Sequence, residues 1–106
     1  QIPITQDYFQ IVHEGMRQSV TGGTATALAV PQVAVAAKTG TAQVGILNQF
    51  VNSWVIGFFP YEHPRYAFAV VMERAPSGTP TGAPYVFRQF LDWLSVHAPE
   101  YLAEAK

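Results

Sequence analysis

The chain has no cysteine and very little charge. The missing cysteines exclude a disulfide framework and thiolate metal sites, although they do not identify a compartment. The net charge of −1, without a basic run, argues against nucleic acid as a partner. Only 12% of the 106 residues are charged and 49% are apolar, so the chain is not disordered and can form a core. So low a charge content also indicates that part of the surface is covered by something else.

Long hydrophobic runs are missing as well. The most apolar stretches are interrupted, one by Pro31 and Gln32 and another by Gly57 and Pro60, so no membrane span is expected in this segment. No signal peptide is expected among the first residues given. The first residue is Gln1 rather than methionine, which favours an excised or processed segment whose parent could carry an N-terminal membrane anchor.

The length predicts that 1–106 is one domain or a piece of one, and the periodicity of apolar residues predicts an α+β fold. An antiparallel sheet of three strands is flanked by an N-terminal and a C-terminal helix. The predicted elements are a helix over 5–20, strands over 33–43, 52–59 and 66–73, and a helix from Pro84 to about His97.

Short connections favour antiparallel pairing, with the second strand central and both helices on one face of the sheet. The small residues Ala67 and Ala69 are expected to face a helix, and 100–106 is expected to be a frayed tail. The large aromatic residues are expected in the core, namely Trp54, Phe58, Phe59, Phe87, Phe90 and Trp93.

The first predicted strand carries the most informative stretch. Its apolar run, 33–37, changes abruptly into Lys38, Thr39, Gly40 and Thr41. Because successive side chains of a strand point to opposite faces, Lys38 and Gly40 share one face while Thr39 and Thr41 share the other. Gly40 lets another backbone come close to the strand. An ammonium group, two hydroxyls and the open edge of the sheet together suit an extended peptide that bears a carboxylate.

This stretch, Lys38-Thr39-Gly40-Thr41-Ala42-Gln43, resembles the third motif of penicillin-binding proteins, the serine DD-transpeptidases that cross-link peptidoglycan. The resemblance extends to Gly-Gly-Thr-Ala at 22–25, to the strands at 52–60 and 66–73, and to the helix from Pro84. It therefore covers nearly the whole chain. The Thr-Ala-Gln ending and the Ala-Pro-Tyr-Val-Phe-Arg-Gln run resemble class B, elongation-type members.

The resemblance implies a role for each residue of the motif. Lys38 supports proton transfer electrostatically from behind the serine of the family's second motif. Thr39 and Thr41 bind the terminal carboxylate of the substrate or the carboxylate of a β-lactam, and the backbone N–H of Thr41 supplies half of an oxyanion hole. Gly40 and Gln43 complete the predicted substrate-binding set. The alternatives without a functional role are a solvent-exposed lysine for Lys38 and ordinary β-forming residues for Thr39 and Thr41. For Gln43 the functional and the non-functional interpretation are almost equally supported.

The family's nucleophile is missing from this segment. Its motifs are Ser-x-x-Lys and Ser-x-Asn, and none of the four serines (Ser19, Ser53, Ser77 and Ser95) is followed by the required lysine or asparagine. Without the nucleophile acylation has no route, so the segment is predicted to be inactive alone. It is expected to be the C-terminal part of a transpeptidase domain and to need the remainder of that domain as its partner.

The resemblance implies that the substrates are stem peptides ending in D-Ala-D-Ala, that β-lactams are inhibitors, and that no cofactor is needed. The three histidines, His13, His63 and His97, lack metal-ligand spacing, so no metal site is expected. The implied location is the periplasmic or extracellular face of the bacterial inner membrane. Two alternatives stay open: a segment of a serine β-lactamase or β-lactam sensor, and a non-enzymatic module whose edge strand binds peptides. If the segment folds alone, we expect it to dimerise, swap or aggregate.

Overall fold

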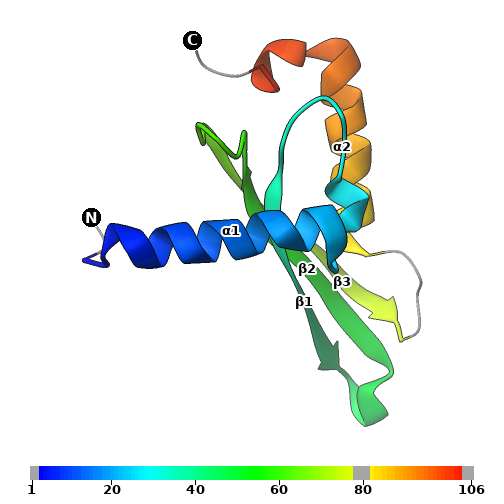
Figure 1. Ribbon diagram of the computed structural model, residues 1–106. Helices are drawn as coiled ribbons and strands as arrows, with labels where there is room; N and C mark the ends of the chain where they lie inside the picture. The colour runs from blue at the N-terminus through cyan, green and yellow to red at the C-terminus, as the bar shows by residue number, and fades with distance from the viewer. Residues whose placement is uncertain (1–2, 78–81, 104–106) are drawn as a thin grey trace.

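The computed structural model describes residues 3–77 and 82–103 and confirms the expected α+β fold. Two helices flank a three-stranded antiparallel sheet (Figure 1). The elements are α1 Gln6–Gly22, η1 Thr26–Leu28, β1 Ala36–Val44, η2 Ile46–Asn48, β2 Phe50–Phe59, β3 Tyr66–Pro76, α2 Ala83–His97 and η3 Pro99–Tyr101.

The sheet has the order β1-β2-β3, so β2 is central and β1 lies at an edge. Both pairings are antiparallel, so the expected antiparallel sheet with the second strand at its centre is confirmed. The register places Thr39 opposite Val55 and Val55 opposite Val70. Since directly opposed residues share a face, these three side chains lie on the same side of the sheet.

Helix α2 covers that side of the sheet. The ring of Phe87 on α2 stacks on the ring of Phe68 on β3, with centroids 3.8 Å apart. Leu91 and Val55 are fully buried in the same core. Ala67 and Ala69, which were expected to face a helix, are exposed on the other side of β3, so that expectation was wrong. The larger Phe68 face buries more apolar area against the helix, and this is the stronger driving force.

Helix α1 crosses the sheet where β1 begins (Figure 1). Val20, near its C-terminal end, is fully buried in the core that α2 also contacts. His13, in its middle, packs against Phe58 at a ring distance of 4.6 Å. Phe58 and its neighbour Phe59 point to opposite sides of β2, and Phe59 lies in the α2 core. Helix α2 thus covers one face of the sheet, whereas α1 contacts both sides, through His13 on one and Val20 on the other. The expectation that both helices cover the same face was wrong.

Strand β1 begins three residues later than expected. The carbonyl of Ala34 accepts a hydrogen bond from the backbone N–H of Tyr61 (2.9 Å), and the carbonyl of Val35 accepts one from Arg17 Nη1 (2.7 Å). These carbonyls are satisfied outside the β1–β2 ladder. Val35 is nevertheless fully buried, so the residues just before β1 belong to the hydrophobic core although they are not part of the strand.

The end of the described chain is more ordered than a frayed tail. Leu102 is buried, and the ring of Tyr101 lies 5.7 Å from that of Tyr66. The guanidinium of Arg65 donates to the carbonyl of Ala103 (2.8 Å). The expected tail is therefore corrected up to residue 103, and 104–106 lie outside the described residues. Strand β3 extends to Pro76, three residues past the predicted end at 73, and 78–81 also lie outside the described residues.

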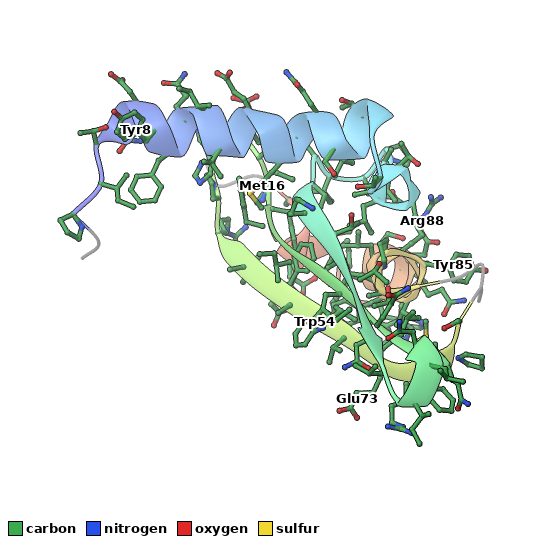
Figure 2. The ribbon with its side chains drawn as sticks, turned by 90° about the horizontal axis from the view of Figure 1, so that it is seen from below. Tyr8, Met16, Trp54, Glu73, Tyr85 and Arg88 are labelled. Atoms are coloured by element: carbon green, nitrogen blue, oxygen red, sulfur yellow. The ribbon has the colours of Figure 1, made fainter. Side chains whose placement is uncertain are left out.

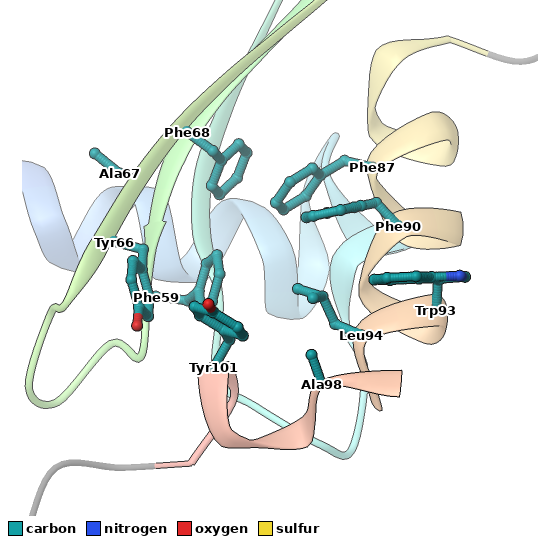
Figure 3. Close-up of a pocket in the computed structure, with 10 residues that line it drawn as sticks. All are labelled: Phe59, Tyr66, Ala67, Phe68, Phe87, Phe90, Trp93, Leu94, Ala98 and Tyr101. Atoms are coloured by element: carbon teal, nitrogen blue, oxygen red, sulfur yellow. The ribbon is translucent and has the colours of Figure 1, made fainter. Parts of the chain in front are cut away.

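An apolar hollow of about 440 Å³ lies between β3 and α2 (Figure 3). Phe59, Tyr66 and Phe68 line it from the sheet, and Phe90 and Trp93 line it from the helix. Phe90 and Trp93 are about half exposed. Their expected place in the core was wrong, because they lie on the side of α2 where the described chain leaves the hollow open.

Trp54 also lies outside the core, on the other side of the sheet. It is 42% exposed because no helix of the described chain covers its part of that face. Figure 2 shows Trp54 and Glu73 on the side of the sheet opposite Tyr85 and Arg88.

Candidate functional site

A polar groove of about 440 Å³ lies on the α2 side of the sheet, beside the middle of β1. The alternation of β1 directs Thr39 and Thr41 into this groove, and Ser53, the partner of Thr41 on β2, joins them. Gly40 of β1 also lines the groove, and the remaining lining residues come from the segment after α1 and from the N-cap and first turn of α2, namely Thr24, Thr26, Ala27, Gly82, Pro84 and Tyr85. The groove thus joins four segments that are distant in the sequence.

The first turn of α2 forms one wall of the groove and is fastened to β2. The backbone N–H of Ala83 donates to Ser53 Oγ (2.9 Å). A Cβ on Gly82 would come within 2.5 Å of the same oxygen, so a side chain at this position would displace the Ser53 hydroxyl from this hydrogen bond. The positive end of the helix dipole therefore lies at the groove, where it favours an anionic group.

The Thr39 hydroxyl has a partner across the groove. Its oxygen lies 2.7 Å from Thr24 Oγ1, which makes this a hydrogen bond between two side chains that are 15 residues apart. Thr24 follows α1 directly, in the Gly-Gly-Thr-Ala stretch at 22–25. The sequence drew attention to this stretch through its resemblance, but nothing in it indicated contact with the motif.

Lys38 lies on the opposite face of β1 from the two threonines, as the alternation predicts. Its ammonium group is exposed and donates to the carbonyl of Thr39. Its partner across the sheet is Ile56, which is half exposed. Within residues 3–77 and 82–103, Lys38 therefore borders an uncovered apolar surface rather than the groove.

Gly40 and Gln43 have different settings. A Cβ on Gly40 would meet its nearest atom, Trp54 Cβ, at 3.8 Å, so the strand is open around this residue. Gln43 is exposed near the end of β1 and is not among the residues that line the groove. The structure thus brings Thr39, Gly40 and Thr41 together at the groove and leaves Lys38 and Gln43 outside it.

The sequence did not single out three further groove residues: Ser53, Gly82 and Tyr85. In the sequence, Ser53 is a strand residue that lacks a lysine at the spacing of the nucleophile motif. Its place in the groove follows from its pairing with Thr41, which depends on the register between β1 and β2. Tyr85 could be read as part of the apolar stripe of the C-terminal helix, yet it is half exposed at the groove. The described part of the chain contains no group of three or more His, Asp or Glu residues that could hold a metal ion. None of the helices in the described ranges has the length and hydrophobicity needed to cross a bilayer.

Comparison with known proteins assigns the chain to a family. The family model described as penicillin binding protein transpeptidase domain matches residues 1–92. The chain belongs to this family. A search of curated protein sequences finds no match.

Solved structures of penicillin-binding proteins are similar over most of the chain. Penicillin-binding protein 2B from Streptococcus pneumoniae strain R6 has the same fold over 92% of this chain, with a TM-score of 0.76 and 24% identity. PBP2 from Pseudomonas aeruginosa, solved in complex with WCK 5153, matches 99% of the chain with a TM-score of 0.71 and 31% identity. The D,D-transpeptidase domain of a peptidoglycan glycosyltransferase from Eggerthella lenta matches 81% with a TM-score of 0.62 and 32% identity. The match covers 17%, 24% and 19% of these three chains respectively, so the present chain spans a small part of each.

Proposed function

We propose that this chain is the C-terminal part of the catalytic domain of a peptidoglycan DD-transpeptidase. The enzyme cross-links stem peptides that end in D-Ala-D-Ala, is acylated by β-lactams, and works on the outer side of the bacterial inner membrane. Membership of the transpeptidase domain family supports the reaction class. The observation that carries the proposal is the pair of hydroxyls, Thr39 and Thr41, that face one groove beside an edge strand.

In this proposal the groove binds the carboxylate of the substrate. Both hydroxyls donate to its oxygens, and the first turn of α2 adds a favourable potential. The substrate backbone runs along β1 and passes Gly40, where the strand offers no steric obstacle. The backbone N–H of Thr41 stabilises the negative charge that develops on the carbonyl oxygen under attack.

The attacking serine belongs to the remainder of the domain. That remainder covers the surface around Lys38, whose ammonium group then faces the serine of the second motif and supports proton transfer. The segment alone has no nucleophile in its sequence, and it is therefore inactive in this proposal.

Fluorescent penicillin tests this proposal directly. The full-length protein should become covalently labelled, whereas the isolated 106-residue chain should not. Thr39→Val and Thr41→Val should each slow acylation of the full-length protein by about 10- to 100-fold, the loss expected for a hydrogen bond to a charged group. Thr21→Val removes a hydroxyl that caps the carbonyl of Gln18 at the end of α1, and it should acylate at the wild-type rate. Labelling of the isolated chain, or normal acylation of both groove variants, would contradict the proposal.

A serine β-lactamase or β-lactam sensor is the alternative within the same fold. It differs in the fate of the acyl-enzyme, because a β-lactamase hydrolyses it rapidly and a transpeptidase holds it. The rate at which the label is lost from the full-length protein separates the two. A non-enzymatic peptide-binding module is the alternative outside catalysis, and the free edge of β1 is the observation that favours it. In that case the full-length protein would bind peptides without being acylated.

A further inference from the structure

The hydrogen bond between the hydroxyls of Thr24 and Thr39 links the motif strand to the segment after α1. A hydroxyl has one proton to donate and two lone pairs that accept. A carboxylate can only accept hydrogen bonds, so Thr39 must donate its single hydroxyl proton to the carboxylate in order to bind it. Thr39 can then only accept from Thr24, and the proton between the two oxygens must come from Thr24.

We propose that Thr24 is a positioning residue for Thr39: it donates to the Thr39 oxygen and so directs the Thr39 proton into the groove, toward a ligand carboxylate. This inference rests on the function proposed above and deepens it. The Thr24 side chain acts through Thr39. A chain of two hydroxyls that ends on an anion is also polarised along its length, which strengthens each bond.

The backbone around Thr24 is held firmly enough for this role. The N–H groups of Gly23 and Ala25 both donate to the carbonyl of Ser19, at 3.1 and 3.0 Å, and this closes the end of α1. A Cβ on Gly23 would come within 2.9 Å of the Ser19 Cα, so the tight turn into Thr24 requires glycine. Ala25 is fully buried directly after Thr24.

Helix α2 also holds the segment after α1 in place. Arg88 Nη1 donates to the carbonyl of Ala27 in η1 (3.1 Å), and Leu28 beside it is fully buried in the core. The segment that carries Thr24 is thus fixed to both helices, while Thr39 is fixed in the sheet. The fold therefore fixes the backbone positions of the two threonines, and at these positions their hydroxyls come within hydrogen-bond distance.

The test uses the full-length protein and two probes, benzylpenicillin and its methyl ester. The ester lacks the negative charge that the Thr39 proton is directed to. Thr24→Val should slow acylation by benzylpenicillin about 3- to 10-fold, the loss expected for one hydrogen bond, and should change the rate with the ester by less than about twofold. Thr24→Ser keeps the hydroxyl and should restore most of the rate. Thr21→Val makes the same chemical change three residues earlier and should have no effect on either probe.

A double-mutant cycle separates positioning from a general structural effect. If Thr24 acts through Thr39, the double variant Thr24→Val, Thr39→Val should be no slower than Thr39→Val alone, to within about twofold. Equal losses with acid and ester, additive losses in the cycle, or a wild-type rate in Thr24→Val would each overturn the inference while leaving the proposed function standing. If the wild-type protein is not acylated at all, the proposed function fails, and the role of Thr24 fails with it.

Discussion

Gly57, near the C-terminal end of β2, lies directly against the ring of Phe68 on β3. A Cβ at position 57 would come within 2.7 Å of Phe68 Cζ, and it would also overlap the carbonyl oxygen of Ala36 on β1. The absence of a side chain at Gly57 thus lets three strands and the ring of Phe68 come together at one point of the core. The ring of Phe68 in turn supports α2, which forms one wall of the groove.

Gly57→Ala should therefore destabilise the transpeptidase domain. The added methyl group must displace backbone as well as an aromatic ring, and overpacking of this kind costs about 1–3 kcal/mol of unfolding free energy. The urea midpoint of the full-length protein, followed by near-UV circular dichroism, measures the loss. Gly15→Ala in α1 is the matched control: nothing lies within 4 Å of the added Cβ, so helix propensity should raise stability by up to about 1 kcal/mol. Equal midpoints for the two variants would contradict the packing described here.

Phe87 should carry more of the stability than any exposed residue of α2. It is buried and stacks on Phe68, and truncation of such a residue to alanine costs about 3–5 kcal/mol. Phe87→Ala should lower the melting temperature of the full-length protein strongly and should also loosen the groove, since α2 supplies Pro84 and Tyr85. Val96→Ala on the same helix is the control, because Val96 is 73% exposed and its truncation should cost less than about 0.5 kcal/mol. A small change for Phe87→Ala would mean that α2 is held by contacts other than the stack.

The order and type of the elements followed from the sequence because local patterns determine them. Helical spacing marked α1 and α2, and alternating β-branched and aromatic residues marked β2 and β3. The central place of β2 followed from its apolar residues on both faces. The face that a helix would choose did not follow, because Tyr66, Phe68 and Val70 compete with Ala67 and Ala69 through total buried area, which local pattern does not report.

The groove was predictable in part. The separation of Lys38 from Thr39 and Thr41 followed from strand alternation alone. The contact between Thr24 and Thr39 did not, since it depends on how the segment after α1 returns to the sheet. The place of Ser53 depends likewise on the register between β1 and β2, which no local pattern determines.

Gly40→Ala should slow acylation without lowering stability. The new Cβ meets only an ordinary contact with Trp54 at 3.8 Å, so the melting temperature of the full-length protein should stay close to that of the wild type. In the proposed function the substrate backbone runs beside this residue at the edge of β1. The methyl group would project to the Lys38 face, where the proposal places the attacking serine, and it should slow acylation by benzylpenicillin on the order of tenfold, through misplacement of the scissile bond. Stopped-flow acylation together with thermal unfolding measures both effects. A wild-type acylation rate in a fully stable variant would show that no backbone approaches the strand at Gly40.

The isolated chain should associate with itself in solution. Ile56 and Trp54 on the sheet and Trp93 on α2 are between 42% and 54% exposed, and Tyr8 and Ile11 on α1 are each more than 60% exposed. Apolar surface of this extent on a small domain favours dimers or larger aggregates, because burial against a second copy removes it from water. Sedimentation velocity between about 1 and 100 μM should show a mass that rises with concentration, and Ile11→Gln combined with Ile56→Gln should weaken the association. A monodisperse monomer with a cooperative melt would favour the autonomous peptide-binding module, because a chain that is stable and monomeric by itself needs no further domain to cover these residues.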